Sequence, residues 1–72
     1  MKIEVSRRHG DKKPVIIFME TSRLIGYLGL SRDYITPTSA DAHAFATFTD
    51  ARTYARDHKE ALLELSVPGV KN

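Results

Sequence analysis

Hydrophobic and polar residues alternate over the first third of the chain in the pattern of β-strands. Apolar and polar side chains take turns over residues 2–8, which predicts a strand with one face exposed to water. Residues 15–20 form an apolar, β-branched run opened by Pro14, which predicts a central strand covered on both faces. Gly10 and Asp11 lie between the two runs and signal a turn. The two strands should therefore form a hairpin.

The pattern is less regular in the middle of the chain. Residues 24–30 predict a third strand, interrupted by two glycines that indicate a bulge or a close approach of two backbones. Residues 31–42 are rich in turn formers, with Tyr34–Ile35 as a candidate for a short edge strand. Residues 42–48 then predict a short strand or an extended lead-in to a helix.

A helical period begins near residue 50. Thr49 is predicted to cap this helix, because its hydroxyl can accept a hydrogen bond from a backbone N–H of the first turn. The alternative cap is Thr47, which forms a Thr-x-x-Asp pattern with Asp50. The apolar face of the helix consists of Ala51, Tyr54, Ala55, His58 and Leu62.

Two patterns overlap at the end of the helix. Ala61 and Leu65 extend the helical face, and residues 60–65 are rich in helix formers. Apolar and polar residues also alternate within 62–67. We predict a strand over 62–67, because a last strand would cover an edge of the sheet. Continuation of the helix is the alternative.

Together these elements predict a single α+β domain over residues 1–72. Its order is β-β-β-(β)-α-(β), with a small antiparallel sheet of three to five strands packed on one α-helix. The predicted core consists of Ile3, Val5, Val15, Ile17, Phe18, Leu28, Leu30, Phe45, Phe48, Tyr54, Leu62 and Leu65.

Composition narrows the location and the chemistry of the protein. The chain has no cysteine, which excludes disulfides and thiolate zinc sites. Its longest apolar run, residues 15–19, is far shorter than the roughly 20 residues that a membrane-spanning helix needs. The first residues contain no apolar signal core. We therefore expect a cytoplasmic protein that makes no use of a membrane.

Residues that could catalyse a reaction or bind a metal form no recognised motif. His9, His43 and His58 contain no pair at i, i+4 spacing, and no serine lies in a Gly-x-Ser-x-Gly turn. A zinc site from His43, His58 and Asp41 is conceivable, but such sites also need supporting partners around the ligands. We expect a protein that is not an enzyme and has no catalytic residue, metal site or cofactor.

Positive charge is the strongest hint of a partner. The formal net charge is +2, yet residues 1–32 carry +4 and residues 33–72 carry −2. The predicted hairpin tip can contact phosphates or an acidic protein surface, the alternative being a solvated turn that protects a sheet edge. The candidate contact residues are Arg7, Arg8, Lys12 and Lys13 in the tip, with Tyr27, Arg32 and Tyr34 as secondary contacts. Arg52, Arg56 and Lys59 could form a second basic stripe on the exposed helix face. Because Asp57 and Glu60 interleave with them, we favour a solvated helix face.

The stretch from Ala44 to Ala55 carries a family resemblance. An Ala-x-x-x-Phe run leads into a Thr-capped helix with an Asp-Ala pair, and this arrangement resembles small phage and prophage proteins, among them anti-CRISPR inhibitors. The resemblance covers about residues 42–56 together with chain size and element order. It implies a stoichiometric inhibitor, without catalytic residues, that binds a protein or ribonucleoprotein complex in the host cytoplasm.

The leading hypothesis is a non-enzymatic protein-binding module of this inhibitor type. A small nucleic-acid-binding domain that uses the same basic tip is the alternative. A third possibility is a self-associating structural protein, a homodimer joined along an exposed sheet edge.

Overall fold

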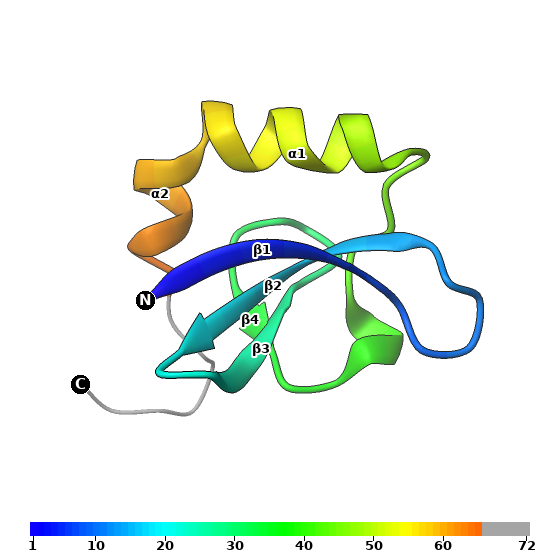
Figure 1. Cartoon of the computed structure of the whole chain (residues 1–72), viewed down its shortest axis with the longest axis horizontal. Helices are drawn as coiled ribbons and strands as arrows, with labels where there is room; N and C mark the ends of the chain where they lie inside the picture. Colours follow the sequence, from blue (N-terminus) through cyan, green and yellow to red (C-terminus); the bar gives the residue numbers. More distant parts are fainter. Residues whose placement is uncertain (66–72) are drawn as a thin grey trace.

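A four-stranded antiparallel sheet with one helix packed across it forms the body of the protein (Figure 1). The computed structural model describes residues 1–65. The strand order is β1-β2-β3-β4, which confirms the predicted α+β fold. The elements are β1 (Lys2–Arg7), β2 (Pro14–Glu20), β3 (Arg23–Leu28), β4 (Ile35–Thr36), the short 3-10 helix η1 (Ser39–Asp41), α1 (Phe48–Asp57) and α2 (Lys59–Leu63).

Strands β1 and β2 form the predicted hairpin. They pair in register from Lys2 opposite Met19 to Arg7 opposite Pro14. Gly10 lies in the turn with φ of 106°, a conformation that glycine adopts at no steric cost. Because β2 lies between β1 and β3, its apolar run is buried, and Phe18 is fully covered. The hairpin therefore supplies the centre of the sheet.

Strand β3 contains the predicted bulge. Phe18 pairs with Gly26 and Met19 pairs with Leu24, so Ile25 is the extra residue. A Cβ atom on Gly26 would lie 2.7 Å from the carbonyl oxygen of Thr36 in β4. The glycine is therefore needed for the close approach of β3 and β4, as the sequence indicated.

Beyond β3 the chain reverses through residues 29–34. The backbone N–H of Gly29 donates to the carbonyl of Tyr34, and the N–H of Arg32 donates back to the carbonyl of Gly29, each at 3.0 Å. Strand β3 thus ends at Leu28, and Leu30 lies in the reversal, 59% exposed. The prediction that Leu30 belongs to the core is wrong for this reason.

Residues 42–45, which we call the inserted segment, lie between the end of β3 and the start of β2 and form hydrogen bonds with both strands. The N–H of His43 donates to the carbonyl of Leu28, and the N–H of Phe45 donates to the carbonyl of Pro14, both at 2.8 Å. Ala42 also forms a bridge with Gly29. The extended lead-in to the helix is thereby confirmed, and it brings Phe45 into the core.

Helix α1 begins two residues earlier than the preferred prediction. Thr47 is the cap: its backbone is extended, and its hydroxyl accepts a hydrogen bond from the N–H of Asp50 at 3.0 Å. Thr49 lies inside the first turn, so it cannot take this role. The Thr-x-x-Asp alternative is therefore correct.

The chain after α1 remains helical. His58 closes α1, and α2 follows over Lys59–Leu63, so the predicted strand over 62–67 is wrong within residues 62–65. The remaining residues of that prediction, 66 and 67, lie outside the described residues. In the helical conformation Leu62 continues the stripe of Ala51 and is buried in the core, which the strand would not have achieved.

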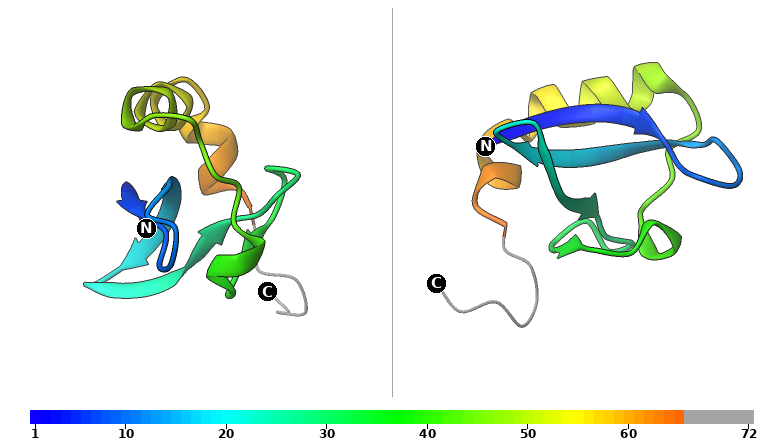
Figure 2. Two further views of the ribbon diagram at one scale, coloured as in Figure 1. Left: turned by 90° about the vertical axis from the view of Figure 1, so that its right-hand side faces the viewer. Right: turned by 60° about the horizontal axis from the view of Figure 1, so that its bottom comes forward.

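The core lies between α1 and the face of the sheet below it. Figure 2 shows the twisted sheet, with α1 above β1 and β2 and α2 turning down from its end. Ile16 and Phe18 face this core, opposite Val5 and Ile3, whereas Ile17 lies on the other face and is half-buried. The prediction that Ile17 belongs to the core is therefore wrong. Four buried hydrophobic residues were missing from the predicted core, namely Ile16, Ile35, Ala42 and Ala51.

Candidate partner-binding surface

The hairpin tip, residues 8–13, is held together by Arg8. Its guanidinium donates to both carboxylate oxygens of Asp11, with 3.1 Å from Nε to Oδ1. The remaining nitrogen, Nη1, donates to the carbonyl of Ala42 at 3.1 Å. Only 18% of the Arg8 side chain is exposed. Arg8 therefore fastens the tip to the inserted segment, and it does not face solvent as a free cation.

The charge of Arg8 is neutralised inside the tip. The hydrogen bonds from Arg8, and another from the backbone N–H of Lys13 at 3.1 Å, lower the pKa of the Asp11 carboxyl well below its ordinary value. Asp11 in turn raises the pKa of Arg8. At neutral pH both groups are ionised and their charges cancel locally. The exposed cations of the tip are Lys12 and Lys13.

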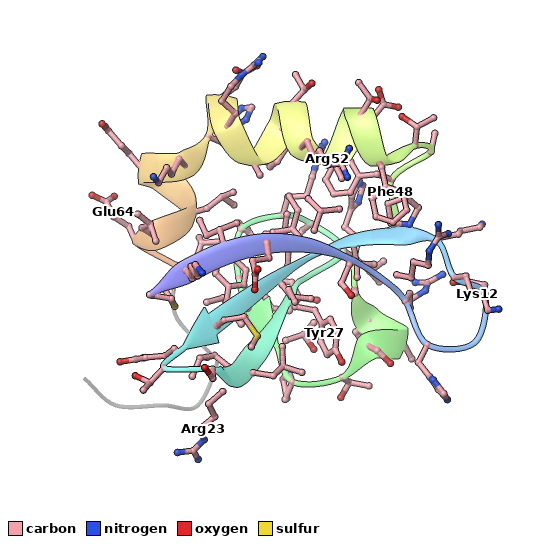
Figure 3. All side chains as sticks on the ribbon, viewed as in Figure 1. Lys12, Arg23, Tyr27, Phe48, Arg52 and Glu64 are labelled. Atoms are coloured by element: carbon pink, nitrogen blue, oxygen red, sulfur yellow. The ribbon has the colours of Figure 1, made fainter. Side chains whose placement is uncertain are left out.

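Arg7 points to a different surface from its neighbour. Its guanidinium carbon lies 4.8 Å from the centre of the Phe48 ring, and that of Arg52 lies 5.5 Å from the same centre. Figure 3 shows Arg52 beside Phe48 at the start of α1. The ring attracts both cations through its electron-rich face. Two arginines from separate elements thus converge on one half-buried aromatic residue.

The prediction that Phe48 belongs to the core is wrong, because the residue is only half-buried. It is the first residue of α1, one turn before Arg52 on the same side of the helix. Ala51 and Leu62 belong to the neighbouring stripe, which is the one buried on the sheet. Phe48 consequently lies at the margin of the core, where Arg7 and Arg52 cover its ring.

A stripe of cations continues along α1 and the adjacent strand. Near the start of β1, Lys2 and Lys59 both line a shallow hollow of about 360 Å³. At the end of β1, Arg7 contacts Phe48, the first residue of α1. Helix α1 therefore runs antiparallel to β1. The hollow is lined by Met1, Lys2, Ile3, Ala55, Arg56, Lys59 and Leu63. We call the cationic surface the basic side, defined by Lys2, Arg7, Arg52, Arg56 and Lys59.

Little negative charge balances the basic side. Within residues 1–65 there are two ion pairs, Arg8–Asp11 and Arg56–Asp57. The second pair spans 3.2 Å between two largely exposed side chains, and such pairs are weak and readily exchanged. Within the described residues, the cations of the basic side other than Arg56 therefore form no ion pair, and two of them lie over the Phe48 ring.

The other predicted contact residues are dispersed. Arg32 lies on the far side of α1, with its guanidinium carbon 5.7 Å from the centre of the Tyr54 ring. The ring of Tyr34 fills the space where Gly29 lacks a side chain. Tyr27 pairs with Ile17 on the sheet face turned away from the core, well apart from Lys12 and Arg52 in Figure 3. The structure thus gathers Arg7 with residues that were not candidates, and leaves Arg32, Tyr27 and Tyr34 elsewhere.

Sequence reasoning missed the basic side as a unit. Lys2 and Phe48 were not candidates, and the second basic stripe of Arg52, Arg56 and Lys59 was considered but a solvated helix face was preferred. A signal was available: Phe48, Arg52 and Lys59 follow the i, i+4, i+11 spacing of one helix side. The sequence does not show, however, that the packing of α1 on β1 brings Arg7 to the ring of Phe48.

Two of the three histidines, His43 and His58, take part in aromatic packing. His43 meets Phe45 edge-on, and Tyr54 stacks on His58 with ring centres 4.1 Å apart. In the described part of the chain, no three side chains of the metal-ligating types lie close enough to hold an ion. Residues 1–65 also contain no helix long and apolar enough to cross a bilayer.

Comparisons of the chain with models of protein families, with curated proteins and with solved structures gave no match.

Proposed function

We propose that this protein is a non-enzymatic protein-binding module whose basic side docks on an acidic surface of a partner protein. The observation that supports this is the row of cations along β1 and α1 that residues 1–65 leave without acidic partners, apart from Arg56. Complementary charge guides association and selects the partner. Arginine and aromatic residues are also frequent among the side chains that dominate binding energy.

The role we propose for the module is that of a phage-type inhibitor. It would cover a working surface of a host protein or ribonucleoprotein complex in the cytoplasm. This role is supported by the sequence resemblance of residues 42–56 and by an exposed surface suited to docking.

A capture experiment with matched charge reversals tests the proposed function. Tagged wild-type protein, Arg52→Glu and Arg23→Glu are used as baits in bacterial lysate, with and without nuclease, and captured proteins are identified by mass spectrometry. Both substitutions reverse the charge of one exposed cation. Arg23, however, is the first residue of β3 and lies far from Arg52 in Figure 3. A partner held by wild type and Arg23→Glu, and lost with Arg52→Glu, is the expected result.

Two outcomes would contradict this function. Equal capture by all three baits would mean that the basic side is not the binding surface. Capture that disappears with nuclease would assign the same cations to nucleic acid, whose binding weakens steeply with salt.

A further inference from the structure

Strand β1 has an open edge next to the basic side. Among the described residues it pairs with β2 alone, so its other side presents unpaired backbone N–H and carbonyl groups. In Figure 2 no other described element lies beside that outer edge. Six residues in β1 give an edge of roughly 20 Å. An edge of this length is long enough to pair with another strand.

The charges around this edge specify what can pair with it. Lys2 and Arg7 lie at the two ends of β1. Arg52 and Arg56 flank it from α1, and Lys59 flanks it from the start of α2. On the face toward α1, an extended segment along the edge would therefore meet positive charge, whereas Glu4, exposed in the middle of β1, lies on the opposite face. Acidic side chains on that segment would find partners, whereas basic ones would be repelled.

The hollow beside Lys2 adds a second requirement. Its floor includes Ile3 and Ala55, and its exposed apolar members are Met1 and Leu63. Lys2, Arg56 and Lys59 form its charged rim. An apolar side chain can be buried there while neighbouring carboxylates meet the rim.

From these features we infer that β1 accepts an extended acidic segment of the partner protein as an added strand. Acidic side chains of that segment face α1, and one apolar side chain enters the hollow at the Lys2 end. Because side chains alternate along a strand, about three residues of the segment face α1 over the length of β1. This inference rests on the proposed function and specifies the mode of docking.

A second copy of this chain fits the edge poorly. Two antiparallel copies of β1 related by a two-fold axis pair residues whose side chains share a face, for example Glu4 opposite Glu4 of the other copy. Both α1 helices would lie on the same face of the joined sheet and bring their cations together. Like charges across a strand pair are destabilising, so the occupant is an acidic partner.

The test uses a defined peptide in place of the partner. The probe is an eight-residue peptide in which glutamate and threonine alternate, with leucine in place of the last glutamate. Two further versions carry N-methyl groups on the odd or on the even residues. In an added strand only every second backbone N–H faces β1. One methylated version should therefore lose at least about tenfold in affinity, while the other binds as the parent does.

Protein variants and amide exchange complete the test. Arg52→Glu should weaken binding of the parent peptide, and Arg23→Glu should leave it unchanged. Amide hydrogen exchange by NMR should slow in β1 when the peptide is added. All of these measurements use the intact chain.

Several outcomes would overturn the inference. Equal binding of both methylated peptides would mean docking through side chains alone, which leaves the proposed function standing. The same holds if the peptide fails to bind while Arg52-dependent capture of a protein persists. Displacement of the peptide by an eight-nucleotide oligothymidine would assign the edge to nucleic acid. Concentration-dependent protection of β1 without peptide would assign it to a second copy.

Discussion

Arg7 and Arg8 are neighbours in the chain, yet the charge of Arg8 is neutralised by an ion pair and the charge of Arg7 is not. In the tip, the guanidinium of Arg8 is enclosed by Asp11 and the carbonyl of Ala42. On the basic side, Arg7 lies over the ring of Phe48 and forms no ion pair within residues 1–65. Arg7 is the last residue of β1, whereas Arg8 already belongs to the tip, and their guanidinium groups reach different elements. The lesson is that cations counted along a sequence differ in whether they remain available to a partner.

The largest effect should come from reversing charge on the basic side. Arg7→Glu combined with Arg52→Glu should weaken partner binding by roughly 100-fold, because both cations beside Phe48 become repulsive. Lys12→Glu combined with Lys13→Glu changes the net charge equally in the tip, and we expect a loss below about tenfold. Titration calorimetry with the captured partner measures both. A greater loss with the tip variant would reverse the comparison of the two surfaces.

Removing the ring that Arg7 and Arg52 share should have the next largest effect. Phe48→Ala should lower the free energy of unfolding by about 1–3 kcal/mol, since the side chain is half-buried. Phe48→Leu keeps apolar volume but loses the ring, so it isolates the cation–ring contribution of about 0.5–1 kcal/mol. Urea unfolding followed by circular dichroism provides the values. If leucine proves equal to phenylalanine, the two arginines gain nothing from the ring.

The tip should respond to acid. Because the pKa of Asp11 is lowered in the folded state, its ionised form stabilises the fold above the ordinary aspartate pKa of about 4. This contribution is lost as the pH falls through the lowered pKa. Asp11→Asn should therefore unfold at lower urea concentration than wild type at pH 7, and the difference should shrink in strong acid. A difference in stability that does not change with pH would mean that the ionised carboxylate of Asp11 does not stabilise the tip.

The smallest changes in stability should come from replacing arginine by lysine at position 7 or at position 8. Arg8→Lys should lower the urea midpoint, because one ammonium group cannot pair with both oxygens of Asp11 and also reach the carbonyl of Ala42. Arg7→Lys should change it by less than about 0.5 kcal/mol, since an ammonium group can also lie over Phe48. The order of the two midpoints is the measurement. Equal midpoints would mean that the geometry of Arg8 is unimportant.

The fold was largely predictable because local signals agreed with the tertiary structure. Alternation marked β1, the β-branched run marked β2, and the glycine at position 26 marked the close approach to β4. The errors came where two local patterns competed. The alternation within 62–67 was overridden by burial of Leu62 on the helical stripe, and Thr47 was favoured as the cap by its extended backbone.

The candidate surface was less predictable because it depends on contacts between distant residues. The sequence places Arg7 and Arg8 in one cluster, but the hydrogen bond from Arg8 to Ala42 spans 34 residues and has no local signal. The approach of Arg7 to Phe48 likewise requires the packing of α1 on β1. Charge patterns along the chain identify cations, whereas only the folded structure identifies which of them are neutralised.

The two margins of the sheet differ in a way that limits how assemblies of this protein can grow. Strand β4 has only two residues, and Pro37 directly after it has no N–H to donate. A strand arriving there would find few groups to pair with, whereas β1 offers six residues. If β1 accepts a strand as proposed, the opposite margin formed by the described residues offers little backbone to a further molecule. We therefore expect such addition to end after one step rather than to continue into a fibre.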